Sequence, residues 1–155
     1  NWYIQKRKEI LQYASPDFTI LLGFELRFDG SENDYLVYGA SDEFLMSHGD
    51  LMSMNLESFS ALAHQNHLLI YQAHPFRYHM SIDGLEAYNG NERHDSHNFL
   101  SVSWASYAHL AMISGSDYHR KGDPCNGGIA TDLPITTEDE LMAYLMTRNY
   151  TLLRG

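Results

Sequence analysis

The sequence has a single cysteine, no apolar run long enough to cross a bilayer, and half as many basic residues as acidic ones. A lone cysteine, Cys125, cannot form an internal disulfide, which excludes a disulfide-stapled secreted scaffold. A membrane span needs about 20 apolar residues, so a transmembrane helix is excluded as well. The first residues do not have the pattern of a signal peptide, so we expect none. We therefore expect a soluble protein of the cytoplasm.

The shortage of basic residues also limits the partners. Ten lysines and arginines stand against twenty aspartates and glutamates, which gives a net charge of −10. Such a surface repels a phosphate backbone, so we expect no binding to nucleic acid. Without an apolar span we expect no membrane partner either. The 155 residues, 44% of them hydrophobic, suit one domain over 1–155 with a sizeable core. Nine histidines are a first hint of metal chemistry.

Periodicity and turn signals predict alternating strands and helices. Helical spacing or capping residues mark 2–13, 43–48, a helix from about 55, 95–110 and a helix after 137. Apolar runs that are typical of buried strands mark 18–28, 35–38, 68–71, 85–88, 111–114 and 150–153. The stretch 123–128 has the composition of a turn. This order predicts an α/β fold with a mainly parallel sheet.

Functional groups of such folds collect at the C-terminal ends of the strands. His74 follows a buried strand, and Pro75 favours an extended conformation for it, so its imidazole is a candidate metal ligand. The alternative is a histidine that is hydrogen-bonded at the rim of the core. Asp117 and His119 are two residues apart, which in an extended chain places both side chains on one side. The pair could therefore bind a metal. The alternative is a turn that begins at Asp117 and leaves His119 exposed.

Further candidates are less specific. Glu25 lies among apolar residues of a strand, where an unpaired charge is costly, so it should bind metal or pair with Arg27 or another arginine. His94 and His97 are spaced to share a helix face, where surface or supporting roles compete with ligation.

Four segments together resemble the PHP (polymerase and histidinol phosphatase) domain family of metal-dependent phosphoesterases. They are Gly23-Phe-Glu25, Gln72-Ala-His-Pro-Phe-Arg77, Ile82-Asp-Gly-Leu-Glu-Ala-Tyr-Asn89 and Ser114-Gly-Ser-Asp-Tyr-His119, in this order at strand ends. The similarity extends from about residue 18 to 154.

The resemblance implies a distorted β/α barrel that holds two or three Mn, Fe, Zn or Mg ions. A metal-activated water would then hydrolyse a small phosphorylated substrate. The resemblance assigns the metal ligands to Glu25, His74, Asp117 and His119. It also makes Asp34 and Asn89 candidates for binding metal or supporting its ligands, and Arg77 a candidate for the substrate phosphate. His94 is a further candidate for either metal role, from its helical spacing alone.

Two departures from the family pattern limit this expectation. The family opens with a His-x-His strand, and no two histidines here are separated by one residue. Many members also carry a histidine on the strand after the glutamate motif, where this sequence offers Asp34. The sequence thus predicts a PHP-like barrel portion without its opening strands, from a longer protein or a degenerate relative. C–N bond hydrolysis is an enzymatic alternative, and a non-catalytic acidic module that binds a partner or one metal is the alternative from another class.

These assignments predict that Asp117 matters most for metal retention. In a protein that includes the missing strands, Asp117→Ala is expected to abolish metal-dependent hydrolysis while the circular dichroism spectrum stays unchanged. Loss of a residue that merely supports a ligand costs about 10–100-fold in metal affinity, and loss of a ligand should cost at least as much. His109→Ala should keep its activity. Equal loss in both variants would show that the site is elsewhere.

Overall fold

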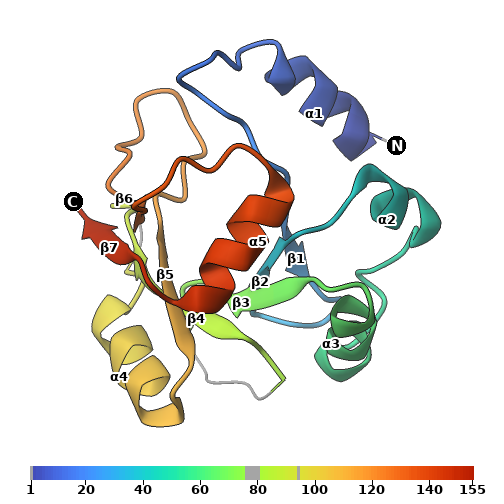
Figure 1. Ribbon diagram of the computed structural model, residues 1–155. Coiled ribbons are helices and arrows are strands. Elements are labelled where there is room, and N and C mark those ends of the chain that lie inside the picture. The colour runs from blue at the N-terminus through green and yellow to red at the C-terminus, as the bar shows by residue number, and fades with distance from the viewer. Residues whose placement is uncertain (1, 76–80, 94) are drawn as a thin grey trace.

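The computed structural model describes residues 2–75, 81–93 and 95–155. Its main feature is a five-stranded sheet with the order β1-β2-β3-β4-β5 (Figure 1). The strands are β1 (Gly23–Arg27), β2 (Asp34–Tyr38), β3 (Leu69–Gln72), β4 (Gly84–Asn89) and β5 (Ala111–Gly115). The helices are α1 (Trp2–Leu11), α2 (Asp42–Ser47), α3 (Leu56–Gln65), α4 (Asn98–Ala108) and α5 (Glu138–Thr147). A second, two-stranded sheet pairs β6 (Gly127–Ala130) with β7 (Thr151–Arg154).

The sheet is mixed, so the expected mainly parallel pairing is wrong for its first half. β2 pairs antiparallel with both β1 and β3, whereas β3, β4 and β5 pair in parallel. The polar stretch 29–33 joins β1 to β2 directly, and such a short connection allows only an antiparallel neighbour. The sheet is open, and the described residues form no closed barrel.

Because β2 reverses direction between its neighbours, β1 points the same way as β3, β4 and β5. The C-terminal ends of four strands therefore lie at one edge of the sheet. The N-terminal end of β2 lies at the same edge, since Arg27 is directly opposite Asp34. The candidate side chains come from this edge.

Alternate residues of the central strands pack on opposite faces of the sheet. Tyr35, Val37 and Ile70 belong to a core cluster with Phe59 and Ala63 of α3. Tyr71 packs on the other face against Leu145 of α5, which crosses in front of the sheet in Figure 1. Burial of both faces explains why these strands are continuous apolar runs.

The caps of two helices follow their sequence signals. Asn55 accepts a hydrogen bond from the backbone of Ser58 at the start of α3. Thr137 and Glu140 form a reciprocal capping box at the start of α5, as the sequence predicts. Helix α4 begins three residues later than expected, because His97 adopts a left-handed conformation and its backbone N–H donates to Asp95.

Strand β6 is the one element that the sequence analysis assigned to a turn. Gly127 lies against β5 so closely that a Cβ atom there would be 2.0 Å from the backbone oxygen of Gly115. The glycine is thus required by the approach of two strands and not by a turn. No helix in the described part of the chain is long and apolar enough to cross a membrane.

The core beneath α3 should be sensitive to truncation. Phe59 is fully buried and its ring contacts Phe28 edge to face, at a centroid distance of 5.7 Å. Phe59→Ala is expected to lower the free energy of unfolding by about 3–5 kcal/mol, measured by urea denaturation. Phe99→Ala is the matched control, because Phe99 is 71% exposed on α4. If the two variants lose the same stability, the core has been placed wrongly.

Candidate metal centre

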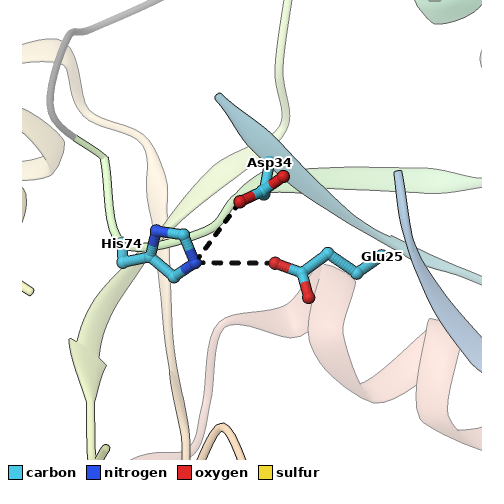
Figure 2. A group of neighbouring side chains, drawn as sticks. All are labelled: Glu25, Asp34 and His74. Carbon is cyan, nitrogen blue, oxygen red and sulfur yellow. Dashed lines mark ion pairs between the residues drawn. The ribbon is translucent and has the colours of Figure 1, made fainter. Parts of the chain in front are cut away.

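Glu25, Asp34 and His74 converge at the strand edge described above (Figure 2). The Nε2 atom of His74 lies 3.5 Å from Oε1 of Glu25 and 3.7 Å from Oδ2 of Asp34. Each residue offers one ligand atom, and the three atoms lie within 4.8 Å of one another. The residues come from β1, the start of β2 and the loop after β3. An imidazole and two carboxylates from three segments thus face a common point.

Asp34 is held by the hairpin that carries it. Its neighbour across the β1–β2 ladder is Arg27, whose guanidinium donates one hydrogen bond to each oxygen of the carboxylate. The fork-shaped guanidinium matches a carboxylate in this bidentate arrangement. The pair raises the pKa of Arg27, chiefly through the hydrogen bond to Asp34. Asp34 is buried, whereas the side chain of Arg27 is largely exposed.

His74 takes its charge state from the neighbouring carboxylates. The hydrogen bond with Glu25 is the largest effect and raises the pKa of His74, and burial of the ring opposes it. The charges of Glu86, Glu25 and Asp34 raise the pKa further. The imidazole is therefore held toward its protonated form when no other cation is bound.

Glu86, in the middle of β4, is a third carboxylate, and it contacts this group through the backbone of His74. It is 3% exposed, and its Oε2 accepts hydrogen bonds from the backbone N–H of His74 at 2.9 Å and from Asn89 Nδ2 at 3.1 Å. Burial raises the pKa of Glu86 to about 7, although both hydrogen bonds act in the opposite direction. Glu86 lies in the segment 82–89 that the sequence analysis places at a strand end, but it was given no role there.

Asp117 and His119 follow β5 and contact each other. Nδ1 of His119 lies 3.0 Å from Oδ1 of Asp117 and 2.9 Å from its backbone oxygen. Asp117 is largely buried and also accepts a hydrogen bond from Asn91 Nδ2 at 2.9 Å, while His119 is about half exposed. The sequence analysis expects these two side chains to lie close together.

A single cleft of about 320 Å³ unites these groups. Its lining includes all four residues that the sequence analysis assigned as metal ligands, together with Glu86 and Asn89. Asp34 adjoins the cleft through its contact with His74. Arg77 and His94 lie outside the described residues. His97 is ion-paired with Asp95 on the approach to α4.

The reasons given for three of these positions were wrong, although the positions converge. Glu25 is not buried, because its side chain projects from the face of β1 into the cleft and is 37% exposed. Its expected partner Arg27 binds Asp34 instead. His74 and Asp117 are not extended, since their φ angles are +23° and +49°. Both residues adopt a left-handed backbone conformation, and both side chains line the cleft.

Glu86 is the cleft residue to which the sequence analysis gave no role. The available signal was a carboxylate inside Gly84-Leu-Glu-Ala-Tyr-Asn89, an otherwise apolar strand whose residues are nearly all buried. A buried charge in such a position needs hydrogen-bond donors, and the donors here come from the loop after β3 and from the end of β4. The loop contact is not visible in the sequence pattern.

No protein-family model matches the sequence, and no curated protein is significantly similar to it. The resemblance to the PHP family therefore rests on the four motifs and remains a prediction.

The contact between Glu25 and His74 makes a direct prediction for the metal-free protein. Glu25→Gln is expected to lower the pKa of His74, measured by NMR titration of the histidine side chains, because the largest cause of the raised pKa is removed. A histidine whose pKa is raised in the folded state stabilises the fold below about pH 6.5, and this contribution is lost as the pH rises through the raised value. Glu25→Gln should therefore lower stability mainly in acid.

Glu57→Gln, on the exposed side of α3, should leave the His74 titration unchanged. An unaltered His74 pKa in Glu25→Gln would contradict the geometry of Figure 2.

Proposed function

We propose that the cleft binds divalent metal ions and hydrolyses phosphate esters, as the resemblance to PHP-type phosphoesterases implies. The observation that supports the proposal most strongly is the convergence of Glu25, Asp34 and His74 from separate segments at the edge where four strands end. Asp117 and His119 line the same cleft. Open α/β sheets bind their ligands at this edge, outside the carboxyl ends of the strands.

The donor set fits a divalent ion of the transition series or Mg²⁺. Ligand atoms about 2.1 Å from a metal in tetrahedral or octahedral geometry lie roughly 3.0–3.4 Å apart. The distances of 3.5 Å and 3.7 Å from His74 Nε2 to the two carboxylates are close to this range. Arg27 occupies one acceptor position on each oxygen of Asp34, and each carboxylate oxygen has a second. Asp34 can thus keep its arginine and still bind a metal.

The proposed roles divide between the two sides of the cleft. Glu25, Asp34 and His74 would hold a first ion, and Asp117 with His119 would contribute ligands from the end of β5. A divalent ion at this place supplies a hydroxide at neutral pH and polarises the phosphoryl group. Contact of Arg77 with the substrate phosphate remains a prediction.

A second candidate, a non-catalytic acidic module, is favoured by one specific observation. The charged side chains of the cleft already pair with one another, as Arg27 with Asp34, His74 with Glu25, and His119 with Asp117. Such a cluster is stable as a hydrogen-bonded network without any ion. A module of this kind would bind a partner or one metal and carry out no hydrolysis.

Metal titration with a matched histidine control separates these functions. In isothermal titration calorimetry with Mn²⁺, His74→Ala is expected to bind at least about 10-fold more weakly than the unaltered chain. His64→Ala should bind equally well, because His64 contacts a single carboxylate, Asp83, outside the cleft. If His74→Ala binds Mn²⁺ as well as the unaltered chain does, the metal centre has been placed wrongly.

Hydrolysis of p-nitrophenyl phosphate with added Mn²⁺ tests the catalytic part. The proposal requires a Mn²⁺-dependent rate that His74→Ala abolishes and His64→Ala retains. Mn²⁺ binding without any phosphoester cleavage would favour the non-catalytic module.

A further inference from the structure

Glu86 is the most deeply buried carboxylate of the cleft, at 3% exposed. Within the described residues no lysine or arginine forms an ion pair with it, and its contacts are the backbone N–H of His74 and the side-chain amide of Asn89. Both donate to the same oxygen, Oε2. Burial of a carboxylate that no lysine or arginine pairs with is costly, and the two hydrogen-bond donors offset part of this cost.

The backbone of His74 is strained. Its φ of +23° lies in the region that favours glycine, and the following Pro75 makes the left-handed side still less favourable. A residue in such a conformation persists only where the surrounding structure holds it. The contact that does so at the amide of His74 is the hydrogen bond to Glu86, at 2.9 Å.

Glu86 is itself fixed from two sides. Asn89, three residues further along β4, donates to its carboxylate at 3.1 Å. On the other side lies Gly115 of β5, where a Cβ atom would be 2.7 Å from Oε1 of Glu86. The carboxylate therefore fills the space that a side chain at position 115 would occupy.

We propose that Glu86 is a positioning residue, which holds the strained peptide of His74 and thereby aims its imidazole at Glu25 and Asp34. Gly115 contributes to this arrangement, because a residue without a side chain leaves room for the Glu86 carboxylate. This inference extends the proposed metal centre, since it assigns Glu86 to the support of a ligand and not to the metal itself.

Gly115→Ala is the sharpest variant for the test. The atom that the new methyl group meets is the far end of a flexible side chain, so the Glu86 carboxylate can move while the sheet remains folded. Gly128→Ala is the matched control, because the nearest atom to a Cβ there is a side-chain carbon of Leu153 at 3.7 Å, an ordinary contact. Glu86→Gln provides the conservative variant, since its amide oxygen can accept both hydrogen bonds that Oε2 accepts.

Mn²⁺ titration gives the first readout. Gly115→Ala is expected to bind about 10–100-fold more weakly than the unaltered chain, the usual effect of losing the group that orients a ligand. Glu86→Gln and Gly128→Ala should bind nearly as well as the unaltered chain. Phe59→Ala, which destabilises the core away from the cleft, should also keep its affinity, so that a general loss of stability is not mistaken for misplacement of His74. Equal losses in Glu86→Gln and Gly115→Ala would overturn the inference, because Glu86 would then bind the metal directly.

The second readout needs no metal and stands even if the chain binds none. Glu25→Gln is combined with each variant, and the resulting drop in the His74 pKa is measured by NMR. The drop should be retained in the Glu86→Gln background and be at least halved in the Gly115→Ala background, because His74 no longer faces Glu25 there. Equal drops in both backgrounds would overturn the inference, whereas failure of Mn²⁺ binding alone would overturn only the proposed function.

Discussion

Strand β2 runs against both of its neighbours, and the candidate site depends on this reversal. It turns β1 into the same direction as β3, β4 and β5, so that four strand ends meet at one edge of the sheet. It also brings the start of β2, and with it Asp34, to that edge. A purely parallel sheet would place the beginning of the second strand at the opposite edge. The Glu25–Asp34–His74 group could not then form.

Excess negative charge is the second constraint on the cleft. Glu25, Asp34, Glu86 and Asp117 gather in or beside one cavity, in a protein with a net charge of −10. Each of these carboxylates is contacted by a different set of positively charged or hydrogen-bonding groups. Arg27 binds Asp34, the His74 imidazole faces Glu25, backbone and amide donors meet Glu86, and Asn91 with His119 contacts Asp117. The hydrogen bond with Glu25 and the neighbouring negative charges raise the pKa of His74, whereas the raised pKa of Glu86 comes chiefly from its burial.

The sequence predicts the parts of the fold that depend on local chemistry. The capping residues Asn55 and Thr137 mark two helices, and the apolar runs mark strands that are buried on both faces. Strand direction was misjudged because apolar runs carry no information about pairing, and the short connection at 29–33 was the only signal for an antiparallel neighbour. Strand β6 was missed because Gly127 is typical of turns, whereas here it serves the contact with Gly115.

The candidate site, like the fold, was predictable only where it depends on the local sequence. His74, Asp117 and His119 follow buried strands, so their meeting at one edge follows from the strand pattern. The left-handed backbone of His74 and the support from Glu86 arise from tertiary contacts that no spacing in the sequence encodes. The assignment of Asp34 came from the resemblance to the PHP family, and its bidentate contact with Arg27 became visible only in the folded hairpin.

We propose that this cleft is built for a divalent ion, and anomalous X-ray diffraction from crystals soaked in Mn²⁺ is the most direct test. We expect an anomalous peak about 2.0–2.3 Å from Nε2 of His74 and from carboxylate oxygens of Glu25 and Asp34. A cleft that stays empty while Mn²⁺ binds at exposed carboxylates elsewhere would contradict it.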